Sequence, residues 1–300
     1  MKNINILTFN YGYGSFTNGP GISCWNFTKF CKKKFNIFTK LDSYIYSDNI
    51  LSFKKYNYNS DIFHWWSGDV PEFLDIAIKE SKLGKKIIIG PNLLDGTNPE
   101  REIQICNMVK PSVILTVNKE IKYKINKYIN FPIEEFMTGP DYDLWTPKKD
   151  INDKILWKGN SRDLSKDISM ALHLKKKFVD NMDIYGYSNI YSYPDTVIPH
   201  SKYYMYVSTS LSETKSEAVL EQMAAGVPCI TNRNVFISGI NYKTGIISDR
   251  NLNEYSKNIK FLLNNKNLRK EMTISARQFI LENFNKNYLD SYYNWIINEY

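Results

Sequence analysis

Short apolar runs alternate with helical segments along almost the whole chain. In the first half these runs are INILTF from residue 4, NIFTKL from residue 36, SDIFHWW from residue 60, KKIIIG from residue 85 and SVILTV from residue 112. The segments between them space their apolar residues as helices do, and VPEFLDIAIKESKLG, for example, ends at Gly84. An order of strand, helix and strand predicts a parallel sheet with right-handed crossovers and helices on its faces.

The same alternation starts again after DLWTPKKDIND, a polar segment that contains proline and covers residues 143–153. The later runs are KILWKG, MDIYGY, YYMYVS, VPCITN and TGIIS, and the chain from residue 268 to its end has helical spacing throughout. A length of 300 residues is sufficient for two domains of about 150 residues each. The sequence therefore predicts an α/β protein with two doubly wound lobes, residues 1–150 and 151–285.

Composition narrows the class of protein. No apolar run approaches the roughly 18 residues of a membrane-spanning helix, and MKNINILTF lacks the features of a secretory signal. The cysteines have no metal-type spacing, so we expect them to be reduced and buried in a cytoplasmic protein, or in the host cytoplasm if the protein is viral. They are Cys24, Cys31, Cys106 and Cys229.

The net charge of +8 is shared by both halves of the chain. Two basic clusters occur, KFCKKKF from residue 29 and KEIKYKINKY from residue 119. Solvated helix faces explain them, and so does contact with the phosphates of a nucleic acid or an anionic membrane surface. A bias towards Lys, Asn, Ile and Tyr, typical of AT-rich genomes, also explains the charge.

In doubly wound sheets, ligands bind at the carboxyl ends of the strands. The first such loop is YGYGSFTNGPGIS, in which Thr17 stands where a dinucleotide-binding fingerprint requires its third glycine. Gly19 and Gly21 precede a helix predicted from about Ile22, where their backbone amides can approach an anion or a sugar on the acceptor side. A simple turn explains the two glycines equally well.

A second loop leads into SETKSEAVLEQMAAGVPCITN, which carries three glutamates. Thr214 and Glu217 fit a capping box, which would start a helix near Ser216. Glu217 and Glu221 then share one helix face, while Glu213 lies in the preceding loop. Chemistry alone is also compatible with a capped, partly exposed helix that carries incidental acids.

Glu213 and Glu221, with seven residues between them and QMAAGVPCI after them, resemble the E-x7-E motif of family-four retaining glycosyltransferases. TGPDYDLWTP and the closing helical segment resemble further parts of that family, so the resemblance spans essentially the whole chain. It implies the GT-B fold, in which two Rossmann-like doubly wound parallel-sheet lobes face a cleft. Residues 1–150, joined by a C-terminal helix at about 286–300, would bind the acceptor, and residues 151–285 would bind a nucleotide sugar.

The resemblance also implies roles for single residues. Glu221 would accept hydrogen bonds from the ribose, and Glu213 would lie at the donor sugar. Backbone amides of Thr214, Lys215, Ser216 and Glu217 would face the sugar and diphosphate. The cations that stabilise the leaving diphosphate would come from WKGNSRDLSKD, in which Lys166 matches a family lysine.

The sequence departs from the family pattern at two of these positions. The family has arginine directly after the glycine, but here Arg162 follows Gly159 by three positions, so Lys158 is a rival for the diphosphate and a surface charge explains either residue. Thr214 stands where the family usually has glycine. Tyr187 lies in YGYSNIYSYP, a loop expected to select the base and sugar.

On the first lobe, His64 matches a family histidine, while Trp66 stands where a second histidine is common. We expect His64, as a catalytic residue, with Trp66 and Asp69 to line the acceptor or sugar pocket; a packed core histidine is the alternative. The DYD at residues 141–143 resembles a metal-binding D-x-D, but its position predicts an interlobe loop without a metal.

The sequence thus predicts a metal-independent, retaining hexosyl- or pentosyltransferase that uses a nucleotide sugar such as a UDP-sugar and no other cofactor. Its hydroxyl acceptor would be a glycan, a lipid-linked glycan or a hydroxymethylated base in phage or viral DNA, with peripheral contact to an anionic surface as a further interaction. A nucleotide-sugar epimerase, a sugar phosphorylase and an inactive nucleotide-sugar-binding protein of the same fold are the alternatives.

Overall fold

The structure is a computed structural model that describes residues 2–9, 19–31, 33–40, 50–149, 151–159, 163–185, 202–213, 215–235, 243–284 and 286–300. The chain divides into two compact units, Met1–Thr138 with Lys286–Tyr300, and Gly139–Asn285. The first unit therefore ends before residue 150. Residues that follow Thr138 pack within the second unit, where Trp145 is fully buried and its carbonyl accepts a hydrogen bond from Arg277.

The first unit contains a seven-stranded parallel sheet in the order β3-β2-β1-β4-β5-β6-β7. Its strands are β1 (Ile4–Thr8), β2 (Phe35–Thr39), β3 (Ile50–Ser52), β4 (Ile62–Ser67), β5 (Lys86–Asn92), β6 (Val113–Thr116) and β7 (Ile133–Glu135). Its helices are α1 (Gly19–Phe30), α2 (Pro71–Lys82), α3 (Pro99–Val109), α4 (Lys119–Ile125) and α10 (Lys286–Glu299), with a 3-10 turn at Phe53–Lys55.

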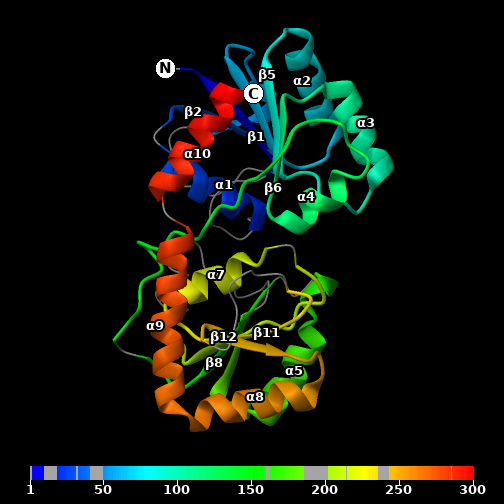
Figure 1. Ribbon diagram of the computed structural model, residues 1–300. Coiled ribbons are helices and arrows are strands. Elements are labelled where there is room, and N and C mark those ends of the chain that lie inside the picture. The colour runs from blue at the N-terminus through cyan, green and yellow to red at the C-terminus, as the bar shows by residue number, and fades with distance from the viewer. Residues whose placement is uncertain are drawn as a thin grey trace. The chain divides into compact units, whose positions relative to one another are not determined.

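Two hydrophobic clusters cover the two faces of this sheet. One cluster includes side chains of α1 and α10, and the other includes side chains of α2, α3 and α4. Figure 1 shows these two groups of helices on opposite sides of the sheet. Successive strand residues point to opposite faces, so along β4 Ile62 and Trp66 join the first cluster while Phe63 and Trp65 join the second. The predominantly apolar composition of the central strands follows from this burial on both faces.

The second unit contains a five-stranded parallel sheet in the order β12-β11-β10-β8-β9. Its strands are β8 (Ile155–Lys158), β9 (Met182–Tyr185), β10 (Met205–Val207), β11 (Cys229–Asn232) and β12 (Gly245–Ser248). Its helices are α5 (Ile168–Lys177), α7 (Glu217–Ala224), α8 (Leu252–Asn264) and α9 (Lys266–Asn283), with 3-10 turns at Leu164–Lys166 and Val179–Asn181. Figure 1 shows the sheet between α5 on one side and α9 on the other.

These findings confirm the predicted α/β class with two parallel sheets and the four buried, free cysteines. The prediction that the C-terminal segment is helical throughout is wrong at one point. Helix α9 ends at Asn283, and Phe284 has the non-helical dihedrals φ −119° and ψ 41°, so α9 and α10 are separate helices. Among the described helices, none combines the length and apolar character needed to cross a membrane.

Each sheet contains one point at which the strand order reverses. In the first sheet the chain goes from β1 outward to β3 and then resumes at β4 on the other side of β1. In the second it goes from β8 to β9 and resumes at β10. Ligands of doubly wound sheets bind outside the carboxyl ends of the strands at such switch points, so the β1/β4 and β8/β10 pairs mark where to look for a site.

Candidate functional site

The β8/β10 switch point brings together residues that are far apart in the sequence. The two strands are parallel neighbours, with Ile155 opposite Met205 and Leu156 opposite Tyr206. Lys158, the last residue of β8, therefore emerges at the same edge of the sheet as the segment after Val207. That segment leads directly to the three glutamates.

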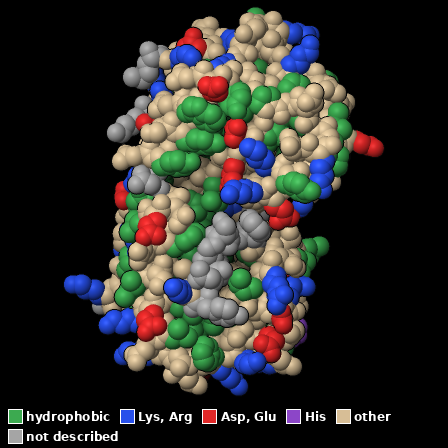
Figure 2. Space-filling model, viewed as in Figure 1, with side chains coloured by type: hydrophobic (Ala, Val, Ile, Leu, Met, Phe, Trp, Pro, Cys, Tyr) green, Lys and Arg blue, Asp and Glu red, His purple; other side chains and the backbone are tan. Residues whose placement is uncertain are grey.

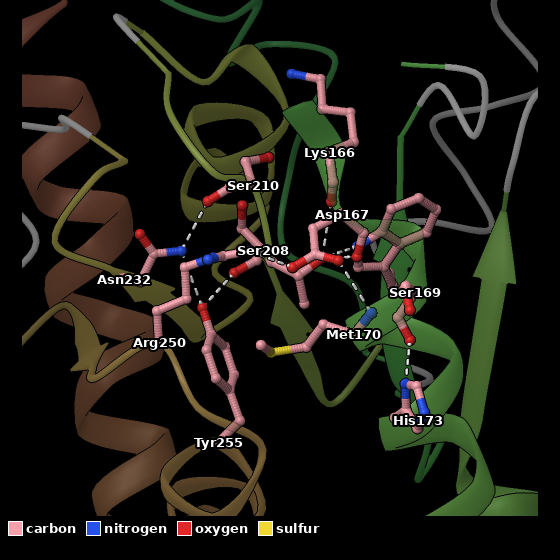
Figure 3. A network of polar contacts seen from close by, with 12 residues as sticks. Lys166, Asp167, Ser169, Met170, His173, Ser208, Ser210, Asn232, Arg250 and Tyr255 are labelled. Atoms are coloured by element: carbon pink, nitrogen blue, oxygen red, sulfur yellow. Dashed lines mark hydrogen bonds and ion pairs between the residues drawn. The ribbon is translucent and has the colours of Figure 1, made fainter. Parts of the chain in front are cut away.

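Buried hydrogen bonds fix the path of the segment after β10 (Figure 3). The side-chain nitrogen of Asn232 donates to the carbonyl of Ser210 over 2.8 Å and lies 3.2 Å from the hydroxyl of Tyr255. The Tyr255 hydroxyl in turn donates to the carbonyl of Ser208 over 2.7 Å. Because these groups are buried, each lost bond would leave an unsatisfied polar atom, and the segment is held rigidly.

Thr209 connects this segment to the 3-10 turn that carries Lys166. Its hydroxyl accepts a hydrogen bond from the indole nitrogen of Trp157 over 2.9 Å and lies 2.9 Å from the carbonyl of Lys166. Asp167, the next residue, forms a 2.5 Å ion pair with Arg250 at the edge of the same network (Figure 3). The turn at Lys166 is thereby fixed beside the segment that carries Glu213.

Glu213 is held by two partners. Its Oε1 lies 2.8 Å from Nζ of Lys166 and accepts a 2.6 Å hydrogen bond from the hydroxyl of Ser210. The side chains of Glu213 and Lys166 are 12% and 26% exposed, so solvent and a ligand reach both.

Glu221 forms a second, more deeply buried pair. Its Oε2 lies 2.5 Å from Nζ of Lys158, and that ammonium lies 4.7 Å from the ring centroid of Trp145. The other oxygen, Oε1, is buried and has no hydrogen-bond partner among the described residues. A buried acceptor without a donor is unfavourable, so this atom is suited to accept a hydrogen bond from a ligand.

Glu217 forms a third pair and does not have the predicted capping role. Helix α7 begins at Glu217 itself, with Ser216 as N-cap and no side-chain cap bond. Oε1 of Glu217 lies 2.5 Å from Nζ of Lys215, and each side chain is only 6% exposed. Burial, with a smaller contribution from the neighbouring carboxylates Glu221 and Glu213, raises the pKa of Glu217 to about 7, although Lys215 opposes the increase.

The donor-side residues predicted from sequence therefore converge where they are described. Gly159 follows Lys158, and a Cβ atom on it would lie 3.2 Å from the Trp157 ring, which suits a residue without a side chain. Arg162, Tyr187 and Thr214 lie outside the described residues. The three glutamate–lysine pairs therefore come from the end of β8, the segment after β10, the turn at Lys166 and helix α7.

The β1/β4 switch point of the first unit is different. His64 is fully buried, its Nε2 donates to the carbonyl of Gly90 over 2.8 Å, and its Nδ1 accepts from the hydroxyl of Tyr293 over 2.9 Å. Burial lowers the pKa of His64 to about 4. Trp66 is also fully buried and stacks on Phe27. Both side chains belong to the core beneath α1 and α10, which corrects the prediction that they line a pocket.

The remaining predicted acceptor-side residues lie near the same strand ends. Gly19 and Gly21 are inside the first turns of α1, which begins three residues earlier than predicted. Asp69 accepts hydrogen bonds from Nε and Nη2 of Arg101 over 2.9 and 2.8 Å. The hydroxyls of Thr8 and Ser67, at the ends of β1 and β4, lie 2.8 Å apart.

Sequence reasoning missed the Lys215–Glu217 pair and the residues that hold the segment after β10. Asn232 could have been identified from the sequence, because it is a polar residue at the end of the buried run VPCITN, where a strand is expected to end. Tyr255 could not have been identified in this way, because it lies within an amphipathic helix, where an aromatic residue is expected to belong to the core.

Comparison with known proteins bears on both units. Residues 149–279 match the family model of glycosyl transferases group 1, which is less than half of the chain but includes all three glutamate–lysine pairs. No curated protein shows significant sequence similarity to the chain.

Solved structures resemble the whole chain. HepE of Anabaena, solved in complex with UDP-glucose, has a TM-score of 0.78 at 9% identity, with all of both chains covered. Sucrose-phosphate synthase of Thermosynechococcus elongatus has a TM-score of 0.76 at 11% identity, with 100% of this chain and 99% of that chain covered. A glycosyltransferase of Rickettsia africae has a TM-score of 0.70 at 14% identity, with 99% and 98% covered. The fold of this chain is thus the α/β fold of GT-B glycosyltransferases.

Proposed function

We propose that this protein is a glycosyltransferase that transfers a sugar from a nucleoside diphosphate sugar, such as a UDP-sugar, to a hydroxyl acceptor. One observation carries the proposal. The unit that matches glycosyl transferases group 1 places Glu213 and Glu221, each paired with a lysine, at its sheet's switch point. The HepE complex with UDP-glucose, which has a similar fold, makes a UDP-sugar the first donor to test.

The donor-binding role of Glu221 follows from its unpartnered oxygen. Oε1 is buried and accepts no hydrogen bond from the described residues, while Oε2 is engaged by Lys158. A ribose hydroxyl that donates to Oε1 would satisfy this atom without breaking the ion pair. Hydrogen bonds to charged groups contribute about 1.5–3 kcal/mol, so this contact would be a main source of donor affinity.

The two lysines would hold the diphosphate. Lys166 is paired with Glu213 before the donor binds, and its partly exposed ammonium can move towards a phosphate as the sugar occupies the carboxylate. Lys158 remains beside Glu221 and contributes positive charge from deeper in the site. Because these ammonium groups can neutralise the leaving diphosphate, we propose transfer without a metal ion.

Glu213 would act at the sugar. A carboxylate held by both Lys166 and Ser210 has a fixed orientation and favours positive charge that develops at the anomeric carbon. Together with the E-x7-E resemblance, this supports retention of the anomeric configuration as the proposed outcome.

The basic cluster at residues 119–128 and the face visible in Figure 2 favour a glycan or lipid-linked glycan over DNA as acceptor. In the cluster at residues 119–128, Lys122 and Lys124 form ion pairs with Glu134 and Glu120. Figure 2 shows basic and acidic side chains interspersed on the visible face. A DNA-binding surface would instead gather unpaired basic side chains.

A panel of UDP-, GDP-, ADP- and dTDP-sugars tests the donor. We expect one nucleotide class to raise the temperature of thermal unfolding by several degrees, because a ligand at 100 times its Kd stabilises the folded state by about 2.7 kcal/mol. The same donor should then release nucleoside diphosphate when glycan or lipid-linked acceptors are added, and the anomer of the product, read by NMR, tests retention.

The matched control is Glu254→Gln, which alters a partly exposed glutamate on α8 that pairs with nearby Lys257. It should keep both the thermal shift and turnover. Binding of a donor without release of nucleoside diphosphate to any acceptor or to water would overturn transfer and leave a nucleotide-sugar-binding protein.

A further inference from the structure

The indole of Trp145 is buried beside the pair of Lys158 and Glu221. Trp145 is fully buried, and Nζ of Lys158 lies over its ring, 4.7 Å from the centroid. An ammonium group at this distance is attracted by the face of an aromatic ring. The same Nζ lies 2.5 Å from Oε2 of Glu221. The indole and the carboxylate are therefore neighbours that share one lysine.

Backbone contacts also hold Trp145 against helix α7. Nη1 of Arg277 on α9 lies 2.9 Å from the carbonyl of Trp145 and 2.7 Å from the carbonyl of Ala224, the last residue of α7. The backbone nitrogen of Trp145 donates to the carbonyl of Asp141 over 2.8 Å. Both backbone groups of Trp145 are thus bonded, and its position beside the helix that carries Glu221 is fixed.

Trp145 and Glu221 each carry one buried polar atom that no described residue satisfies. On Trp145 this atom is Nε1, which can only donate a hydrogen bond. On Glu221 it is Oε1, which can only accept one while the carboxylate is ionised. Because a buried indole N–H usually finds an acceptor, and an unsatisfied group of either kind is unfavourable, both atoms are suited to a ligand.

The ribose of a nucleoside diphosphate sugar has the chemistry that these two atoms require. Its 2′ and 3′ hydroxyls lie on adjacent carbon atoms, and each hydroxyl can both donate and accept. One hydroxyl can donate to Oε1 of Glu221 while its neighbour accepts from Nε1 of Trp145. Diphosphate oxygens that carry no proton only accept, so they cannot satisfy the carboxylate.

We propose that Trp145 recognises the ribose of the donor, with Nε1 donating to one ribose hydroxyl while the adjacent hydroxyl donates to Oε1 of Glu221. This inference rests on the proposed donor function and extends it, because it makes Trp145 a specificity-determining residue. The site then selects ribonucleotide donors, such as UDP-sugars, against 2′-deoxyribonucleotide donors, such as dTDP-sugars. A deoxyribose leaves the indole or the carboxylate unsatisfied, which lowers affinity by about tenfold or more.

The native protein provides the first test. Isothermal titration compares UDP-glucose with two analogues, one without the 2′ hydroxyl of the ribose and one without the 3′ hydroxyl. We expect each analogue to bind about tenfold or more weakly than UDP-glucose, because each hydroxyl satisfies one buried atom. An analogue that binds as tightly as UDP-glucose overturns the inference, and this result requires no variant protein.

Trp145→Phe identifies the hydroxyl that the indole contacts. Phenylalanine keeps an aromatic face for Lys158 and the backbone bonds, but it lacks the N–H group. We expect this variant to bind UDP-glucose about tenfold more weakly than the native protein does. The loss should disappear for the analogue that lacks the contacted hydroxyl and persist for the other analogue. A purely structural role of the indole would instead weaken the binding of all three ligands by the same factor.

Gln222→Met is the matched control. Gln222 follows Glu221 in α7, is fully buried, and carries amide atoms for which the described part of the chain offers no partner. Methionine has a similar length without the amide, so this variant should keep the native ratios of affinity among the three ligands. If Gln222→Met removes the discrimination and Trp145→Phe keeps it, Gln222 is the donor to the ribose and the inference is wrong.

Two further results are distinguished by the same titrations. Equal weakening of all three ligands in Trp145→Phe would overturn the inference and leave an ordered water as the partner of the indole N–H. The absence of UDP-glucose binding to the native protein would remove the UDP-sugar function itself, and the inference with it.

Discussion

The two switch points of this protein occur in sheets of the same kind and differ in their chemistry. At β8/β10, three carboxylates and three ammonium groups form buried or half-buried pairs. At β1/β4, the described strand ends carry the hydroxyls of Thr8 and Ser67, and the nearby histidine is neutral and enclosed in the core. The same topology therefore provides a position for a site, and the side chains at the strand ends decide whether it can hold a charged ligand.

Buried ion pairs alone do not make a ligand site, and the first unit shows this. Glu80 on α2 pairs with Lys85 over 2.8 Å, with side chains 0% and 13% exposed, and also accepts a hydrogen bond from Tyr56. This pair closely resembles that of Glu221 and Lys158 in burial. It lies at the carboxyl end of a helix rather than at a strand switch point, so we assign it a structural role.

The largest effect is expected for Glu221→Ala. Removing one partner of a buried pair leaves the other charge without compensation, and we expect the free energy of unfolding to fall by about 3 kcal/mol. The donor-induced rise in unfolding temperature should disappear as well. Chemical denaturation and thermal unfolding with and without UDP-glucose measure the two effects.

Glu80→Ala in the first unit is the matched control for this prediction. It should lower the free energy of unfolding by a similar amount and keep the donor-induced shift. The double variant Glu221→Ala with Lys158→Met should recover stability without recovering the shift. A donor shift that persists in Glu221→Ala would contradict the ribose role and remove the distinction between the two pairs.

The variant Glu213→Gln tests whether the β8/β10 switch point takes part in the reaction itself. The amide keeps the shape of the side chain but loses the negative charge opposite Lys166 and the developing positive charge of the sugar. We expect kcat to fall by about 100-fold to 1,000-fold, the range typical when one preorganised electrostatic contact is lost, with donor affinity changed by less than about tenfold.

Ser210→Ala is the accompanying variant, because it removes one hydrogen bond to Glu213 and leaves the carboxylate charged. Its kcat should fall by no more than about tenfold, the equivalent of one hydrogen bond. Release of nucleoside diphosphate measures both variants. Equal kcat in Glu213→Gln and the native protein would remove Glu213 from the reaction.

The amino-acid pattern was sufficient to place the strands other than β3 and β7, most helices and the spacing of Glu213 and Glu221. Their lysine partners followed once β8 and β10 were known to end at the same edge. The Lys215–Glu217 pair could not be predicted from helix periodicity, because residues two apart do not share a helix face. The pair forms because α7 begins at Glu217 and Lys215 precedes the helix.

His64 is a residue whose environment the sequence pattern could not predict. A period of two along β4 puts His64 and Trp66 on one face of the sheet, but the pattern cannot show what covers that face. The cover includes Tyr293 on α10, which is 229 residues away in the sequence. Long-range packing of this kind turned an expected site residue into a core residue.

The two buried titratable groups predict opposite pH responses in the two units. The pKa of His64 is lowered to about 4, so its contribution to stability is fully present above pH 6.5 and is lost as pH falls towards 4. The pKa of Glu217 is raised to about 7, so its contribution is fully present below pH 4.5 and is lost as pH rises through 7. Each effect amounts to on the order of 2 kcal/mol between pH 5 and 7.

Urea unfolding of the native protein, His64→Gln and Glu217→Gln at pH 5 and pH 7 tests these signs. The stability difference between the native protein and His64→Gln should increase with pH, and that between the native protein and Glu217→Gln should decrease. Parallel changes in the two differences would show that burial does not control both groups as described.

The smallest effect is expected for the ion pair of Asp69 and Arg101 near the β1/β4 switch point. Both side chains are about one third exposed, so Asp69→Asn and Arg101→Gln should each lower the free energy of unfolding by less than about 1 kcal/mol, and the loss should vanish in 1 M salt. If Asp69 serves only this pair, the two variants will be indistinguishable in turnover. If Asp69 contacts the acceptor, Asp69→Asn alone will raise the KM for the acceptor while donor binding stays unchanged. A KM increase of tenfold or more in that variant, absent from Arg101→Gln, would give the first unit a ligand-binding carboxylate and reduce the difference between the two switch points to one of burial.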